Sequence, residues 1–246
     1  MLEQTNVPSV LAPFYDDFLI DELLYVVKSG KEATVYACKA HPSTGVELLA
    51  AKVYRGRNDR SFRNDAVYQE GRYIADKRLR KAFAKKSNKG KQVQFATWVT
   101  SEYVTLETLH ATGSDVPRPY AQAEGAILME YVGDADGPAP PLRGVRLQPE
   151  EVGPLFERLL HNIALWLAAG WVHGDLSAFN VLYWEGGVKV IDFPQAVEAQ
   201  VNRNAFALLE RDVSNICTYF ARYGLVRDPA RLAHELWRRH ASDRPR

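Results

Sequence analysis

The segment WVHGDLSAFNVLYWEGGVKVIDF, residues 171–193, is the most informative part of the chain. Asp175 and Asn180 lie ahead of the apolar run VLYW, and Asp192 follows the run GVKVI. Two short apolar runs joined by Gly-rich residues are typical of a β-hairpin. We therefore expect Asp175 and Asn180 in one loop, Asp192 at the end of the next strand, and all three side chains close together.

The spacing of these residues is typical of phosphoryl transfer. In that reaction a carboxylate accepts the proton of the attacking hydroxyl, while an Asn oxygen and a second carboxylate hold Mg²⁺ across the phosphates. Four residues separate Asp175 from Asn180, as in the catalytic loop of kinases. Taken alone, each residue also fits an ordinary turn, in which Asp and Asn bond to nearby backbone. The set together predicts Asp175 as catalytic base, with Asn180 and Asp192 as metal ligands.

The first part of the chain has the pattern of an antiparallel β-meander. Its β-rich runs are separated by the turn-forming stretches SGKE and HPSTG, and they are LLYVV (23–27), ATVYACKA (33–40) and VELLAAKVY (46–54). A helix is expected at about 98–112, followed by the extended stretch DVPRPY and a buried strand that begins at Ala126.

Helices dominate the second part. Apolar residues at helical spacing predict helices over 149–170, over about 203–223 and over the final PARLAHELWRRH. Strands first and helices later predict an α+β protein of two lobes, with a sheet and one helix in the first lobe and mainly helices in the second. The Pro- and Gly-rich residues 133–144 mark the boundary, which gives lobes of about 20–132 and about 133–240.

Lys52 lies in the apolar strand LLAAKVY. A strand lysine is often an exposed side chain, but beside a helical glutamate it orients the phosphates of a nucleotide. Glu102 and Glu107 both lie where such a partner is expected. The stretch SGKEATVY from Ser29 has the position of a phosphate-binding turn between two strands, although it is not a GxGxxG loop.

Several motifs together resemble the RIO family of atypical serine/threonine protein kinases. They are SGKEATVY, the strand lysine, VPRPY before MEYVG, HGDLSAFNVL, IDFPQAV and LLERDVSNICTYFARYG, and they extend from about Leu23 to Gly224. The resemblance implies one RIO-type kinase domain over 1–246, with a two-lobed kinase-like fold and no activation segment. In agreement, no APE-like motif follows Asp192. With about twenty residues ahead of the first strand, we expect the compact form without a winged-helix domain.

The resemblance also implies the ligands and their contacts. ATP is the expected nucleotide and Mg²⁺ the expected metal, with Mn²⁺ as an alternative. Members of the family phosphorylate themselves and hydrolyse ATP, and the metal-binding Asp, here Asp192, can become an aspartyl phosphate. Glu102 is preferred to Glu107 because SEYVTLETL matches the family pattern. The residues expected at the nucleotide are Ser29, Lys31, Glu32, Lys52, Glu102, Met129, Glu130, Tyr131 and Asn180, with Glu130 and Tyr131 presenting hinge backbone to adenine.

Charge and composition suggest few partners. Lys and Arg number 31 against 30 Asp and Glu, so the net charge of +1 gives no general case for nucleic acid or membrane. Residues 55–91 form the one strongly basic stretch, either a solvated, mobile loop or a docking surface for RNA or a ribosomal particle. With two cysteines, no signal peptide and no apolar run of membrane-spanning length, we expect a cytoplasmic protein.

Two other functions remain open at this point. Aminoglycoside and choline kinases also use an HGD loop with a later Asn and Asp, but they carry a bulkier acceptor-binding region than the roughly 40 residues between Glu130 and His173. An ATP-controlled binding or assembly factor has the same catalytic residues and uses hydrolysis as a switch. Turnover measured with and without acceptors separates the factor from a kinase.

Overall fold

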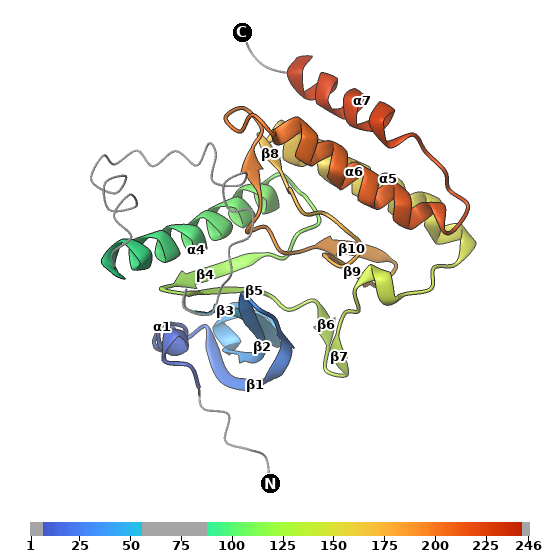
Figure 1. Ribbon diagram of the computed structural model, residues 1–246. Coiled ribbons are helices and arrows are strands. Elements are labelled where there is room, and N and C mark those ends of the chain that lie inside the picture. The colour runs from blue at the N-terminus through green and yellow to red at the C-terminus, as the bar shows by residue number, and fades with distance from the viewer. Residues whose placement is uncertain (1–6, 56–87, 243–246) are drawn as a thin grey trace. The chain divides into compact units, whose positions relative to one another are not determined.

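The computed structural model describes residues 7–55 and 88–242, which belong to two compact units (Figure 1). The first unit contains residues 7–55 and 88–104 together with Pro117–Pro138. The second contains Thr105–Val116 and the chain from Ala139 onward. The division after Pro138 falls inside the expected boundary at 133–144, but Thr105–Val116 joins the second unit and not the first.

A five-stranded antiparallel sheet forms the centre of the first unit, with the strand order β1-β2-β3-β5-β4 (Figure 1). The expected meander is present. In chain order the strands are β1 (Ile20–Ser29), β2 (Ala33–Ala40), β3 (Leu48–Tyr54), β4 (Pro119–Ala123) and β5 (Ala126–Glu130). Because side chains alternate between faces, β3 directs Leu49 and Ala51 to a different side from Ala50 and Lys52.

One face of this sheet is covered by the beginning of the described chain. The turn η1 (Ser9–Leu11) and helix α1 (Ala12–Asp16) precede β1 and contribute Leu11 and Phe14, which are fully buried beside Cys38. Burying each of these two apolar side chains stabilises the unit by about 1.5–3 kcal/mol. The same burial raises the pKa of the Cys38 thiol to about 12, so this cysteine is an unreactive part of the core.

Helix α4 (Asn88–Ala111) is longer than expected. The sequence predicted a start at about 98, and one of the two interpretations of residues 55–91 was a mobile loop, but the backbone is helical from Asn88. Apart from Gly90, residues 88–98 contain nothing that strongly opposes a helix, and Lys, Gln and Ala favour one. The helix ends before Gly113, whose φ of 78° suits a residue without a side chain. The rest of the basic stretch, residues 56–87, lies outside the described part of the chain.

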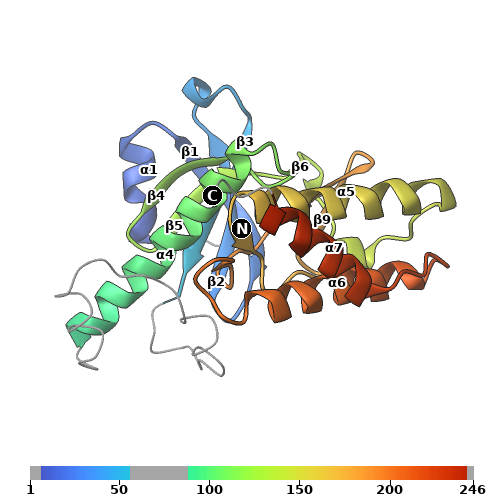
Figure 2. The ribbon, with the colours of Figure 1, turned by 90° about the horizontal axis from the view of Figure 1, so that it is seen from above.

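Three helices make up most of the second unit, where α7 packs against both α5 and α6 (Figure 2). They are α5 (Pro149–Ala168), α6 (Ala205–Ala221) and α7 (Pro229–Ser242). Helix α5 begins with a proline at its first position and a capping box formed by Gln148 and Glu151. It stops before Gly170, whose φ is 83°. None of the helices within residues 7–55 and 88–242 is long and apolar enough to cross a membrane.

The remaining elements of both units are short strands and 3₁₀ turns. In the first unit they are the turn η2 (Pro42–Thr44) between β2 and β3 and the hairpin of β6 (Gly133–Asp134) and β7 (Gly137–Pro138). In the second unit they are η4 (Leu142–Gly144), β8 (Trp171–Val172), β9 (Val181–Trp184), β10 (Gly187–Val190) and β11 (Val197–Glu198). β9 and β10 form the hairpin expected from the segment 171–193, and β8 pairs with β11.

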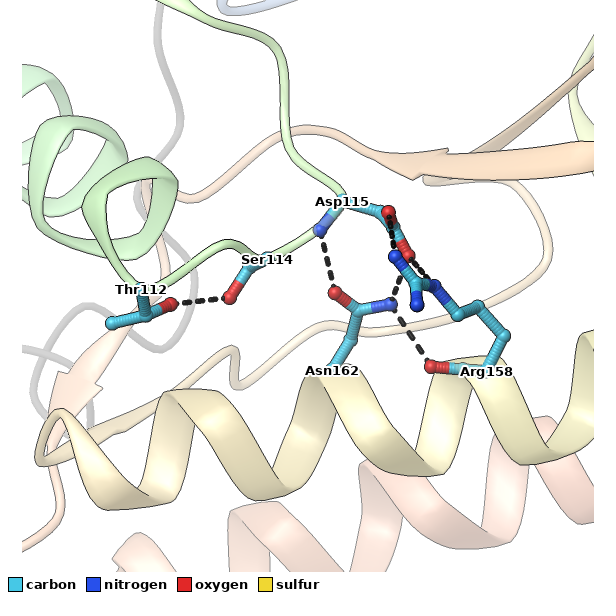
Figure 3. A network of polar contacts seen from close by, with 5 residues as sticks. All are labelled: Thr112, Ser114, Asp115, Arg158 and Asn162. Atoms are coloured by element: carbon cyan, nitrogen blue, oxygen red, sulfur yellow. Dashed lines mark hydrogen bonds and ion pairs between the residues drawn. The ribbon is translucent and has the colours of Figure 1, made fainter.

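A polar network fixes the segment after α4 against α5 (Figure 3). The side-chain oxygen of Asn162 accepts from the backbone N–H of Asp115 at 2.7 Å, and its nitrogen donates to the Asp115 carboxylate and to the backbone oxygen of Arg158. Arg158 makes two further bonds to the same carboxylate. Burial raises the pKa of Asp115, but the bonds from Arg158 and Asn162 outweigh it and leave the pKa lowered. The Asp115 carbonyl then accepts from Val190, two residues before Asp192.

Substituting Asn162 tests this network. The side chain is fully buried, so we expect Asn162→Ala to lower the free energy of unfolding by about 2–3 kcal/mol, because the Asp115 N–H loses its acceptor. Urea denaturation measures the change. As a control, Arg231→Ala removes an exposed pair with Glu235 on α7 and is expected to cost less than about 0.5 kcal/mol. Equal losses in the two variants would contradict the role given to Asn162.

Candidate active site

Lys52 and Glu102 form a buried ion pair in the first unit. The Lys52 Nζ lies 2.6 Å from Glu102 Oε1, and the two residues are only 8% and 6% exposed. The other carboxylate oxygen of Glu102 accepts a 2.6 Å hydrogen bond from the hydroxyl of Tyr54. Glu107, the alternative partner, is exposed. Lys52 is therefore held by the glutamate preferred from the sequence, while the supporting contact from Tyr54 was missed.

The turn between β1 and β2 contains the residues expected at the phosphates. Gly30 donates its N–H to the carbonyl of Ala33 at 2.9 Å, which closes a tight turn, and Lys31 and Glu32 are exposed on it. Ser29 accepts a 2.6 Å hydrogen bond from the guanidinium of Arg55. The backbone N–H of Arg55 also donates to the Glu32 carbonyl. Arg55, which follows β3, therefore forms hydrogen bonds with both ends of this turn.

The residues expected at the adenine lie at the end of β5. Met129 belongs to an apolar cluster on one face of the sheet whose buried members are Ala37, Ala50 and Tyr131. Such a surface suits a flat heterocycle. The hydroxyl of Tyr131 is 2.8 Å from that of Tyr25 on β1. Glu130 accepts through its side chain from the backbone N–H of Arg118.

In the second unit, helix α6 holds the loop that contains Asp175. Asp212 accepts from the backbone N–H groups of Gly174 at 2.8 Å and Leu176 at 2.9 Å. Arg211 donates to the Gly174 carbonyl and Asn215 to the Leu176 carbonyl. Burial raises the pKa of Asp212 to about 7, while the two backbone donors and the Arg211 charge act in the opposite direction.

These three residues of α6 were not predicted. The signal was present for Asp212, which falls among the apolar positions Leu208, Leu209, Val213 and Ile216 of the buried helix face. A carboxylate at such a position needs partners in the interior. Backbone N–H groups of a distant loop are partners that a sequence pattern does not identify.

Asp175 lies in a mixed electrostatic environment. Although the residue as a whole is exposed, its carboxyl is partly desolvated, which raises its pKa above the ordinary value. The nearby charge of Asp192 raises it further, while Arg211 and a hydrogen bond from Asn180 oppose the increase. A raised pKa suits a group that accepts a proton near neutral pH.

Hydrogen bonds to the backbone hold Asn180 and the residue before Asp192. The Asn180 side chain donates from Nδ2 to the carbonyl of Asp175 at 2.9 Å, and its own carbonyl accepts from Ile191. His173 Nδ1 accepts from the Asp175 N–H, so the other ring nitrogen carries the proton and donates to the Ile191 carbonyl at 3.2 Å. Asp192 itself has a left-handed backbone with φ of 74°, a conformation that costs free energy for most residues.

The donor set fits Mg²⁺. Since Nδ2 of Asn180 is used in the bond to Asp175, its amide oxygen is the atom that can ligate a cation. The Asp192 carboxylate supplies a second oxygen. Mg²⁺ typically takes one or two carboxylates and completes its shell with water and phosphate oxygens. Accordingly, within residues 7–55 and 88–242 no group of three or more His, Cys, Asp or Glu side chains is arranged as a metal cage.

Breaking the buried ion pair tests its energetic role. Lys52→Met leaves the Glu102 charge buried beside Tyr54 alone, so we expect a loss of about 3 kcal/mol in the free energy of unfolding. The double variant Lys52→Met/Glu102→Leu removes that charge and is expected to be more stable than the single variant. Urea denaturation of both, with the exposed Glu107→Leu as control, gives the comparison. Additive losses in the double variant would show that the two side chains do not interact.

Comparisons with known proteins show which family the chain resembles. A RIO domain family model matches residues 34–232. The RIO-type serine/threonine-protein kinase Rio1 of Haloferax volcanii is 35% identical over 206 residues, 82% of this chain and 64% of that protein. The serine/threonine-protein kinase RIO1 of Homo sapiens is 31% identical over 210 residues, 85% of this chain and 35% of that protein.

A solved structure shows the fold. The complex of Rio2 kinase from Chaetomium thermophilum with ADP/Mg²⁺ and phosphoaspartate has a TM-score of 0.68 at 22% identity and covers 93% of this chain and 64% of that chain. The fold is therefore of the kinase-like α+β class. The chain spans 35% to 37% of the length of the human and Caenorhabditis elegans relatives. Because the family model covers most of its length, the chain belongs to the RIO family.

Proposed function

We propose that the chain is an ATP-dependent phosphotransferase, a RIO-type serine/threonine protein kinase that phosphorylates itself or another protein and hydrolyses ATP. The observation that carries the proposal is the convergence of Asp175, Asn180 and Asp192 on one loop and hairpin. Asn180 bonds to Asp175, and Asp192 is close enough to raise the pKa of Asp175. The similarity to curated RIO kinases over most of the chain supports the same activity.

In this proposal each residue has a defined task. Lys52, oriented by Glu102, donates hydrogen bonds to the nucleotide phosphates, and the turn of Ser29, Lys31 and Glu32 lies along them. The apolar face with Met129 receives the adenine, and the backbone of Glu130 and Tyr131 forms hydrogen bonds with it. Asp175 accepts the proton from the attacking hydroxyl or water.

The proposed metal ligands are Asn180 and Asp192. When bound, Mg²⁺ or Mn²⁺ neutralises charge on the phosphates and fixes their orientation. Asp192 has a second proposed task as nucleophile, in which a carboxylate oxygen forms a bond to the γ-phosphorus and ADP leaves. The phosphoaspartate in the related Rio2 structure supports that step. The backbone of Asp192 is itself strained, with φ of 74°, which fits a residue placed for function and not for stability.

The decisive test is incubation with Mg²⁺ and γ-labelled ATP. We expect wild type to release phosphate or to become labelled, and Asp175→Asn and Asp192→Ala to lose at least about 100-fold of this activity, as removal of a catalytic acid-base group does. Asp136→Asn, at an exposed turn, serves as the matched control. Hydroxylamine releases label from an aspartyl phosphate and leaves phosphoserine intact. A wild type without activity, or an active Asp175→Asn, would refute the proposal.

A switch function is the main alternative. An ATP-controlled assembly factor uses the same residues, so it differs only in the fate of the phosphate. In the same assay, phosphate release that does not change when protein acceptors are added favours the switch. Transfer to added protein favours the kinase. A small-molecule kinase would instead transfer label to an aminoglycoside or choline.

We also propose a cytoplasmic location and RNA or a ribosomal particle as partner of the basic stretch 55–91. Binding through phosphates weakens as salt rises, and each lost contact makes the negative slope of log K against log salt less steep by about 0.7 to 0.9. We expect reversal of five positive charges within this stretch, named below, to weaken binding to an RNA hairpin. Fluorescence anisotropy at several salt concentrations measures the binding, and reversal of Arg231 and Arg239 on α7 is the control. Unchanged binding would exclude this surface. The reversed residues are Arg78, Arg80, Lys81, Lys85 and Lys86.

A further inference from the structure

An exposed aromatic residue directly precedes one of the proposed metal ligands in the sequence. Phe179 immediately precedes Asn180, and it is 57% exposed. The guanidinium of Arg143 stacks on it, with its central carbon 4.7 Å from the ring centroid. Both residues belong to the second unit. Neither takes part in the phosphate chemistry described above.

Arg143 is held in place by its backbone. Its N–H donates to the carbonyl of Ala178 at 3.0 Å, so η4 is attached to the catalytic loop one residue before Phe179. On the other side, Tyr219 of α6 donates to the carbonyl of Leu142 at 2.7 Å. Leu142 is fully buried. The backbone that carries the exposed side chains of Phe179 and Arg143 is therefore held rigidly.

The hydroxyl of Tyr223, also near the end of α6, adds a second attachment. It donates to the carbonyl of Val145 at 3.1 Å. Arg146 follows and is exposed, so the attached segment presents two arginines, Arg143 and Arg146, to solvent. A backbone segment that is already held in place lowers the entropy lost when a partner binds.

The stacking leaves Arg143 able to bind an anion. When a guanidinium stacks through its flat face, its N–H donors stay in the plane of the group and remain available. There they can form a bidentate pair of hydrogen bonds with a carboxylate. Within the part of the chain that the structure describes, this guanidinium has no carboxylate partner; its recorded side-chain contact is the ring of Phe179. The ring edge adds apolar area beside the charge.

We propose that Phe179 and Arg143 form an acceptor-docking surface that selects a protein segment with an acidic residue near the phosphorylated serine or threonine. The carboxylate binds Arg143, and an apolar side chain of the segment packs on Phe179. The proposal rests on the kinase activity proposed above, because it names the acceptor for that site.

Two synthetic serine peptides test the surface. They share one leucine beside the serine and differ only in their flanking residues, Asp and Glu in one and Lys and Arg in the other. With Mg²⁺ and γ-labelled ATP, we expect wild type to have the higher kcat/KM for the acidic peptide. Arg143→Glu is expected to lower the ratio of acidic to basic kcat/KM by about three- to tenfold or more, the range of a partly exposed charge pair. Phe179→Ala is expected to raise KM for both peptides.

The controls separate this proposal from the proposed function. Arg239→Glu, exposed in the last turn of α7, makes the same charge change and is expected to leave the ratio unchanged. Thermal melting of each variant verifies folding. If wild type hydrolyses ATP and Asp175→Asn does not, but neither peptide is phosphorylated or Arg143→Glu leaves the ratio unchanged, the docking surface is wrong and the phosphotransferase stands. The docking surface would also be wrong if single-stranded RNA inhibited peptide phosphorylation while wild type showed no preference between the acidic and the basic peptide. A wild type that turns over no ATP defeats both proposals.

Discussion

The carboxylate of Asp212 accepts hydrogen bonds from the backbone N–H groups of Gly174 and Leu176, on the two sides of Asp175. A carboxylate this deeply buried is costly, and burial raises its pKa to about 7. That cost is offset only while both N–H groups point at its oxygens. The loop conformation and the buried charge therefore stabilise each other, and the position of Asp175 follows from a helix residue 37 positions later in the chain.

The first unit uses the same physical arrangement for a cation. Lys52 is buried, and its charge is stabilised by Glu102, whose second oxygen is used by Tyr54. Buried ion pairs contribute little net stability compared with apolar groups of similar size. What they contribute here is orientation, because neither side chain can turn away without leaving a buried charge alone. In both units a buried charge fixes the group proposed to act on the nucleotide.

The sequence predicts elements and spacing well, and side-chain partners poorly. The strands around ATVYACKA and the helix from 149 follow from local periodicity, and the short spacings of Asp175, Asn180 and Asp192 around one hairpin predict that they lie close together. The start of α4 at Asn88 was missed because composition near a helix end is ambiguous. The contacts of Tyr54 with Glu102 and of Arg211 with Gly174 join segments about 40 residues or more apart. No local pattern contains that information.

Helix α6 connects two parts of the second unit that local patterns treat separately. Its Asp212 fixes the loop that contains Asp175, and about two turns later Tyr219 fixes η4 through the Leu142 carbonyl. The loop and η4 also bond directly, from the Arg143 N–H to the Ala178 carbonyl. These contacts join α6, the loop and η4 to one another, so a displacement of α6 moves both Asp175, the proposed base, and the segments that carry Phe179 and Arg143. Under the two proposals, substitutions that loosen this helix therefore affect proton transfer and acceptor binding together, whereas changes at the Arg143 side chain affect only binding.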